Sequence, residues 1–184
     1  MVKPSRPVMP SPSMTASAFS PSDPDFEAKV RASFARQPFM ATLGARLGAV
    51  AAGRAEVVLP YAEAVTQQHG FFHGGSIGAI ADTAGGYAAF TLFPPDSTVL
   101  TVEYKINIMA PGKGERLVAV GEVTRSGRTL TVVRVDVYAE AGDSRIHCAT
   151  ATQTLICLMG RSDTKASDTK ASDTKAGDSA AASA

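Results

Sequence analysis

The chain of 184 residues contains no tryptophan, few aromatic side chains and almost no net charge. Aromatic residues make up only 7% of the sequence, whereas a surface that stacks nucleic-acid bases depends on them. Lysine and arginine together number 18 and aspartate and glutamate 17, so the composition indicates no affinity for polyanions or anionic membranes. These shortages argue against a nucleic-acid-binding or membrane-surface protein.

Cysteine is also scarce. The two cysteines, Cys148 and Cys157, fall in one predicted strand, where nine residues separate them by roughly 30 Å. They cannot form a disulfide with each other, and a chain without disulfides is typical of the cytoplasm. Residues 1–20 lack a continuous apolar segment of signal-peptide length. We therefore expect a cytoplasmic protein.

Both ends of the chain have compositions that cannot build a hydrophobic core. Residues 1–21 are rich in proline and serine, and the C-terminal segment repeats SDTKA three times. We predict a disordered extension over 1–21, one folded domain over 22–160 and a disordered tail over 161–184.

The segment between Phe71 and Pro95 has one formal charge, Asp82, and predicts a helix within residues 74–93. It is too polar and glycine-rich to span a membrane, and a helix apolar on most faces belongs in a core. Its five glycines and five alanines indicate close approach to a sheet or to a second copy of the helix. A carboxylate there is costly unless it is paired or used, which makes Asp82 the leading candidate for chemistry.

Strand patterns surround this helix. A first helix is expected to begin near Ser22, which has capping-box spacing to Asp25, and two short strands should flank Gly53. Four further strands are predicted over 97–109, 117–124, 129–140 and 146–158. In the first of these, alternation places five apolar residues on one face: Leu100, Val102, Tyr104, Ile106 and Ile108. The economical packing is an α+β domain in which an antiparallel sheet curls around the helix.

Gly74 would lie at the N-terminus of the long helix, where backbone N–H groups have no partner within the helix. Such a terminus can stabilise the oxyanion that forms when a carbonyl is attacked, although Gly74-Gly75 could also simply make a tight turn. Asp82 lies eight residues later, about 12 Å along the axis. The two can serve one carbonyl only if two helices run antiparallel across a two-fold axis, which gives two equivalent sites per homodimer.

Two other motifs have weaker support. His69 and His73 have His-x-x-x-His spacing, but they lie in a loop with no evident third ligand, so a loop-fixing role for His73 outweighs a metal ligand or general base. Residues 74–78 match the G-x-S-x-G motif of serine hydrolases around Ser76. The segment before Ser76 is polar rather than a buried strand, which disfavours that reading. The partners that would follow in order are Asp136 or Asp143 and then His147.

Together these residues resemble a known family. The series Gln67-x-x-Gly70-x-x-His73-Gly74-Gly75, followed by Ala81-Asp82-Thr83-Ala84, is similar to the signature of hotdog-fold acyl-CoA thioesterases of the phenylacetate-degradation (PaaI-type) group. The resemblance spans about residues 36–158. It implies a hotdog fold, in which an antiparallel sheet wraps one long central helix, and a homodimer that usually pairs into a homotetramer.

The resemblance also implies roles for single residues. The N–H of Gly74 would polarise the thioester carbonyl, and Asp82 of the partner subunit would act as general base or nucleophile. His73 would support the loop, and Thr101 would help position water. Gln67 stands where many relatives have asparagine, so it keeps the amide with one more methylene.

The acyl-CoA nucleotide would lie against basic turns. Arginine and lysine at turns suit phosphate groups, although such residues are also ordinary solubilising charge. The resemblance assigns CoA binding to seven residues: Lys113, Arg125, Ser126, Gly127, Arg128, Thr129 and Leu130. The implied reaction is hydrolysis of an acyl-CoA to a free acid and CoA, with no metal or redox cofactor. The alternatives are a non-catalytic acyl-CoA-binding protein and an enoyl-CoA hydratase-type enzyme.

Overall fold

The computed structural model describes residues 19–161 and residue 163. The predicted N-terminal extension up to residue 18 and nearly all of the SDTKA tail lie outside the described residues. In chain order the elements are α1 (Phe26–Ala35), α2 (Pro38–Leu43), β1 (Arg46–Ala51), β2 (Arg54–Pro60), the 3-10 helix η1 (Glu63–Val65), α3 (Gly74–Phe90), β3 (Ser97–Ile108), β4 (Arg116–Ser126), β5 (Leu130–Ala141) and β6 (Ser144–Met159).

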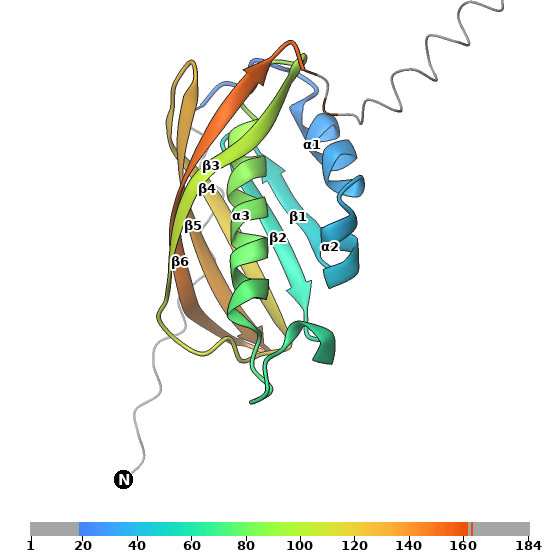
Figure 1. The fold of residues 1–184 in the computed structure, drawn as a ribbon, viewed down its shortest axis with the longest axis vertical. Helices are drawn as coiled ribbons and strands as arrows, with labels where there is room; N and C mark the ends of the chain where they lie inside the picture. The colour runs from blue at the N-terminus through green and yellow to red at the C-terminus, as the bar shows by residue number, and fades with distance from the viewer. Residues whose placement is uncertain (1–18, 162, 164–184) are drawn as a thin grey trace, which may run out of the picture.

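The six strands form one antiparallel sheet in the order β1-β2-β4-β5-β6-β3. Figure 1 shows the sheet curled around α3, with α1 and α2 beside β1. This arrangement confirms the predicted α+β fold with one long central helix. None of the helices in the described ranges is long and apolar enough to cross a bilayer.

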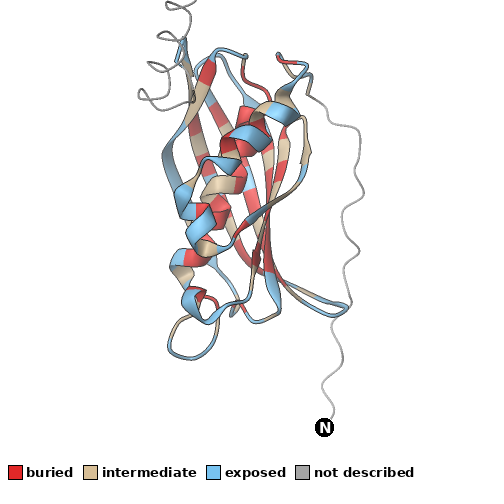
Figure 2. Ribbon diagram, turned by 90° about the vertical axis from the view of Figure 1, so that its right-hand side faces the viewer, coloured by how far each residue is buried: buried red, intermediate tan, exposed pale blue. Residues whose placement is uncertain are grey.

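The core lies between α3 and the concave face of the sheet. Strict alternation along β5 buries five side chains on that face: Thr131, Val133, Val135, Val137 and Ala139. They face a helix whose Ile77, Ile80 and Phe90 are also almost fully buried. Figure 2 shows buried positions on α3 and on the strands that it covers. A helix buried over most of its surface explains why the sequence holds only one charge there.

Glycine lets α3 approach the sheet closely at two points. A Cβ atom on Gly121 of β4 would lie 2.5 Å from the carbonyl oxygen of Ala84 in α3. A Cβ atom on Gly85 of α3 would lie 1.8 Å from Oε1 of Gln153 in β6. No real Cβ contact is that short, so both positions require glycine in this packing. Close approach to a sheet, one of the two predicted reasons for the small residues, is therefore confirmed.

The predicted alternation of β3 is wrong at its start. The register against β6 shifts between Thr101 and Glu103, where Val102 forms a β-bulge. Since opposed residues share a face, Thr101 points inward with buried Leu155, while Leu100 pairs with Ile156 on the outer face. After the bulge the inner positions are Tyr104, Ile106 and Ile108. The bulge therefore aims both Thr101 and Tyr104 at α3.

The predicted capping box at Ser22 is also wrong. Helix α1 begins at Phe26, and its N-cap Asp25 makes no side-chain cap. Buried Asp23 instead fixes the turn before α1, because its carboxylate accepts a hydrogen bond from the N–H of Asp25 at 2.9 Å and pairs with Lys29 at 3.0 Å. Burial raises the pKa of Asp23, but these two donors outweigh burial and leave the pKa lowered. Phe19, within the segment predicted to be disordered, packs against the core.

The end of the long helix also differs from its prediction. Helix α3 ends at Phe90 rather than at residue 93. The Thr91 hydroxyl donates to the carbonyl oxygen of Ala88 and accepts from the N–H of Gly53, at 2.6 and 2.8 Å. These bonds tie the helix end to the β1–β2 turn.

The two thiols of β6 provide a test of this fold. Cys148 is fully buried, and burial raises its pKa to about 11; Cys157 is half-buried, and burial raises its pKa as well but leaves the thiol partly accessible. We expect one thiol per folded chain to react with iodoacetamide at pH 8, measured by mass spectrometry. Cys157→Ser should remove that reaction and Cys148→Ser should leave it intact. Rapid labelling of Cys148 without unfolding would contradict the packing described for β6.

Candidate active site

Asp82 lies half-buried on α3 and its carboxylate is held from two strands. The Thr101 hydroxyl of β3 donates to Oδ1 of Asp82 at 2.8 Å, and Nε2 of Gln153 in β6 donates to the same oxygen at 2.5 Å. Within the described part of the chain, Oδ2 accepts no hydrogen bond. One oxygen is therefore anchored, and the other is available to water or substrate.

Gln153 was not predicted from the sequence as a site residue. It is 1% exposed and stands at an inner position of β6, between buried Ala151 and Leu155. The only sign of it in the sequence was that Gln153 is the single amide among the otherwise apolar alternate positions of β6. Its function could not be predicted, because its partners lie 71 and 52 residues away in sequence.

A small cavity of about 230 Å³ opens beside Asp82. Its far wall contains Tyr87, whose Oη lies 3.1 Å from Oγ of Ser33 and accepts a hydrogen bond from Nε2 of Gln37 at 2.9 Å. Burial raises the pKa of Tyr87, against the effect of these two hydrogen bonds. Asp163 also lines the cavity, where it pairs with Arg36 at 2.6 Å. The cavity thus has hydroxyl and amide groups in its wall.

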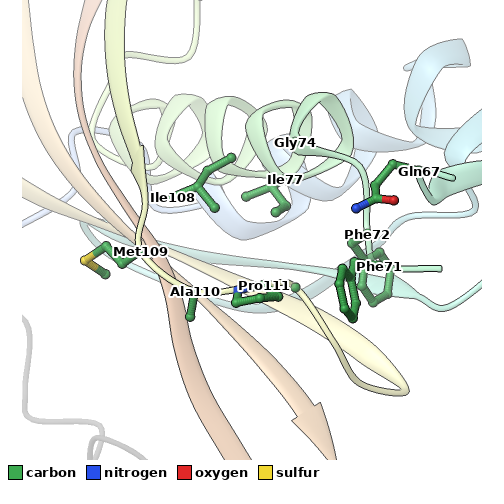
Figure 3. Close-up of a pocket in the computed structure, with 10 residues that line it drawn as sticks. Gln67, Phe71, Phe72, Gly74, Ile77, Ile108, Met109, Ala110 and Pro111 are labelled. Carbon is green, nitrogen blue, oxygen red and sulfur yellow. The ribbon is translucent and has the colours of Figure 1, made fainter. Parts of the chain in front are cut away.

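A second cavity, of about 410 Å³, lies in front of Gly74 (Figure 3). Its wall is mostly apolar and comes from the loop before α3, the first turns of α3, the end of β3 and the loop after β3. The lining residues are Gln67, Phe71, Phe72, Gly74, Ile77, Ile108, Met109, Ala110, Pro111 and Gly112. Oε1 of Gln67 accepts a hydrogen bond from the N–H of His69, so Gln67 closes the turn of its own loop.

His73 is the N-cap of α3. Its Nδ1 accepts a hydrogen bond from the N–H of Gly75 at 2.8 Å, which satisfies one of the free donors of the first turn. His69 is exposed and lies four residues earlier in the loop. Among the described residues, no group of three or more His, Cys, Asp or Glu side chains is arranged to hold a metal ion. A loop-fixing role for His73 agrees with this geometry.

Gly74 and Asp82 belong to separate sites within one chain. The two cavities share no lining residue. Eight residues of continuous helix place the two positions about 12 Å apart along the axis of α3.

The residues predicted to bind CoA are also divided. Lys113 lies in the loop before β4, next to Gly112, whose carbonyl oxygen accepts from the N–H of Phe72 near Gly74. The 125–130 turn lies at the other end of β4, about 33 Å along the strand. There it borders a cavity of about 800 Å³ with Arg161 and residues 92–94. Lys113 and this turn therefore cannot hold one nucleotide within a single chain.

The serine-hydrolase alternative has no support in the structure. The Ser76 hydroxyl is buried in the first turn of α3 and donates to the carbonyl oxygen of Val65 at 3.0 Å. His147 and Asp136 do lie within 3.1 Å of each other, but on the outer face of β5 and β6. The sheet separates this pair from Ser76.

The sequence matches a model of the thioesterase superfamily over residues 69–146, which includes Gly74 and Asp82. A solved thioesterase family protein from Silicibacter pomeroyi is 49% identical, with a TM-score of 0.72, and the match covers 73% of this chain and 99% of that chain. The chain belongs to the thioesterase superfamily. The PaaI protein of E. coli, at 19% identity, shares the fold with a TM-score of 0.67, covering 74% of this chain and 96% of that one. The predicted hotdog thioesterase family is thus confirmed.

Two curated relatives of this thioesterase family add to the comparison. A protein of Saccharolobus solfataricus, described as a candidate esterase, is 39% identical over 84 residues, which are 46% of this chain but only 59% of that protein's length. The 1,4-dihydroxy-2-naphthoyl-CoA hydrolase of Listeria monocytogenes is 28% identical over 99 residues, or 54% of this chain and 80% of that enzyme. The thioesterase family and the hydrolase relative support a thioester hydrolase.

The cap on α3 predicts a specific response to changes at His73. His73→Ala should lower the free energy of unfolding by about 0.5–2 kcal/mol, because the N–H of Gly75 loses its acceptor. His73→Asn should restore most of that loss, because asparagine caps helices well. Thermal or urea unfolding measures both, with His69→Ala as the matched control. If His73→Ala left stability unchanged but abolished turnover, a catalytic base would replace the capping role.

Proposed function

We propose that this thioesterase-family protein hydrolyses an acyl-CoA thioester to a free acid and CoA. The observation that carries the proposal is the carboxylate of Asp82, with Oδ1 held by Thr101 and Gln153 and Oδ2 unengaged. The helix N-terminus at Gly74 supplies the complementary group, and the relative that hydrolyses a naphthoyl-CoA supports the CoA ester as substrate class.

In this mechanism the N–H of Gly74 donates to the thioester carbonyl oxygen and stabilises the negative charge that develops there. Oδ2 of Asp82 removes a proton from water, which attacks the carbonyl carbon, or it attacks that carbon itself and water later cleaves the resulting anhydride. Either route breaks the C–S bond and releases CoA as its thiol.

We propose a homodimer as the catalytic unit, because Gly74 and Asp82 of one chain are too far apart to share a carbonyl. Strand β3 lies at the edge of the sheet and exposes apolar side chains on both of its faces: Leu100 on the outer face, Val102 at the bulge, and Tyr104 and Ile108 on the inner face. A long apolar edge strand is a template for pairing with another chain. The less buried side of α3 carries small residues that would let two helices approach: Gly75, Ala79, Thr83 and Gly86.

In an antiparallel pair of helices, Gly74 of one chain would face Asp82 of the other. The same pairing would bring the 125–130 turn of one chain toward the Gly74 end of its partner, so that Lys113 and Arg128 from different chains could hold one nucleotide. A homotetramer built from two dimers and a cytoplasmic location are further proposals, the second supported by two free cysteines.

Asp82→Asn tests the reaction directly. We expect wild-type protein to release thiol from at least one member of a panel of short, medium, long and aromatic acyl-CoAs. Asp82→Asn should lose at least about 100-fold in kcat, because the asparagine amide can neither accept the proton from water nor attack the carbonyl carbon. Asp143→Asn, in the exposed β5–β6 turn, is the matched control. Wild-type binding without turnover would identify a non-catalytic acyl-CoA-binding protein.

Mixing inactive chains tests the shared site. Gly74→Phe chains mixed with Asp82→Asn chains should recover part of the activity, because one site of each mixed dimer keeps both groups. Subunit exchange is verified by mass-tagging one variant. No recovery in verified mixed dimers would place the whole site in one chain.

Arg128→Ala tests the nucleotide end. Contacts far from the scissile bond bind ground and transition states alike, so this change should raise KM for acyl-CoA more than it lowers kcat. The expected loss in kcat/KM corresponds to about 1–3 kcal/mol, and it should vanish for an acyl-pantetheine, which lacks the nucleotide. Arg31→Ala, on exposed α1, is the control. Equal losses for both substrates, or no loss for either, would show that this turn does not hold the nucleotide.

A further inference from the structure

We infer that Gln153 is a positioning residue for the carboxylate of Asp82, an inference that rests on the function proposed above. Its amide nitrogen donates to Oδ1 of Asp82 at 2.5 Å, to the backbone oxygen of Asp82 at 3.1 Å and to the hydroxyl of Thr101 at 3.2 Å. Thr101 in turn donates to the same Oδ1. Gln153 therefore orders both the carboxylate and its other donor.

The other end of this amide has no partner. Oε1 of Gln153 is buried and accepts no hydrogen bond from the described residues. It lies against Gly85, where even a methyl group would collide with it at 1.8 Å. Burying an unpaired amide oxygen destabilises the fold, and packing alone would favour a methionine or leucine on this face of β6. The amide is thus costly to the fold, and Gly85 is the position that makes room for it.

The orientation of the amide follows from the chemistry of its neighbour. An ionised carboxylate only accepts hydrogen bonds, so Oε1 turned toward Oδ1 would set two acceptors together. With Nε2 toward Asp82, Oδ1 accepts hydrogen bonds from both Gln153 and Thr101, while Oδ2 accepts none from the described residues. Besides Asp82, the charged and titratable groups in the same cavity are Tyr87 of α3 and Asp163, which pairs with Arg36 at the C-cap of α1. All three are unchanged in the variants below.

Two substitutions separate positioning from packing. Gln153→Met keeps the length and removes the donor, so we expect kcat for the best acyl-CoA to fall about 10- to 100-fold while KM stays within about twofold. Gln153→Glu can donate only when protonated, so its kcat relative to wild type should be higher at pH 5 than at pH 8.

Thr131→Val is the matched control. Thr131 is fully buried on the concave face of β5, and its hydroxyl also lacks a partner among the described residues, but it does not touch Asp82. We expect wild-type kcat and pH profile from this variant, with an equal or higher melting temperature.

The inference is overturned if folded, oligomeric Gln153→Met keeps the wild-type kcat. If Gln153→Met does not fold, Gln153→Glu decides, and an unchanged ratio to wild type between pH 5 and pH 8 overturns the inference. The proposed function fails separately, when wild-type protein hydrolyses no acyl-CoA or when Asp82→Asn stays fully active.

Discussion

The rise of an α-helix sets the central constraint on this protein. Gly74 and Asp82 are carried by one continuous helix, which keeps them about 12 Å apart whatever the side chains around them do. A carbonyl polarised at one position cannot be reached by the carboxylate at the other. The chemistry proposed here therefore depends on the chain meeting a second copy of itself, and the edge strand β3, with its exposed apolar side chains, is the surface that we propose for this pairing.

The position of Asp82 depends in turn on how closely α3 packs against the sheet. Gly121 lets the backbone of β4 approach that of α3, and Gly85 makes room for the amide of Gln153. On the other side, the bulge at Val102 turns Thr101 inward. Strands β3, β4 and β6 thus all contribute to the placement of Oδ1 of Asp82. A site held in this way can orient the second oxygen without a charged partner.

Local signals in the sequence were enough to predict most of the fold. The start of α3 at Gly74, the hairpin at Gly53 and the turn at residues 142–143 each depend on residues next to one another in the chain. The bulge in β3 was not predictable, because Leu100 to Ile108 alternates without a break and only the pairing with β6 shows the extra residue.

The site residues also fall into two groups: those that local sequence predicts and those whose role appears only after folding. Asp82 and Gly74 stood out from composition and helix geometry, and the His73-Gly74-Gly75 series matched a family. Gln153 did not stand out, since an amide inside a strand acquires meaning only from partners brought to it by folding. The start of α1 was mispredicted for a related reason: the N-cap is Asp25 rather than Ser22, and Asp23 is held in the preceding turn by Lys29, from the next turn of the chain.

A crystal structure with a non-hydrolysable acyl-CoA analogue, in which a methylene group replaces the thioester sulfur, tests the central claim most directly. We expect the analogue's carbonyl oxygen within hydrogen-bond distance of the Gly74 N–H of one chain and its carbonyl carbon beside Oδ2 of Asp82 from the other chain. A carbonyl bound with both groups from the same chain, or remote from every Asp82, would contradict it.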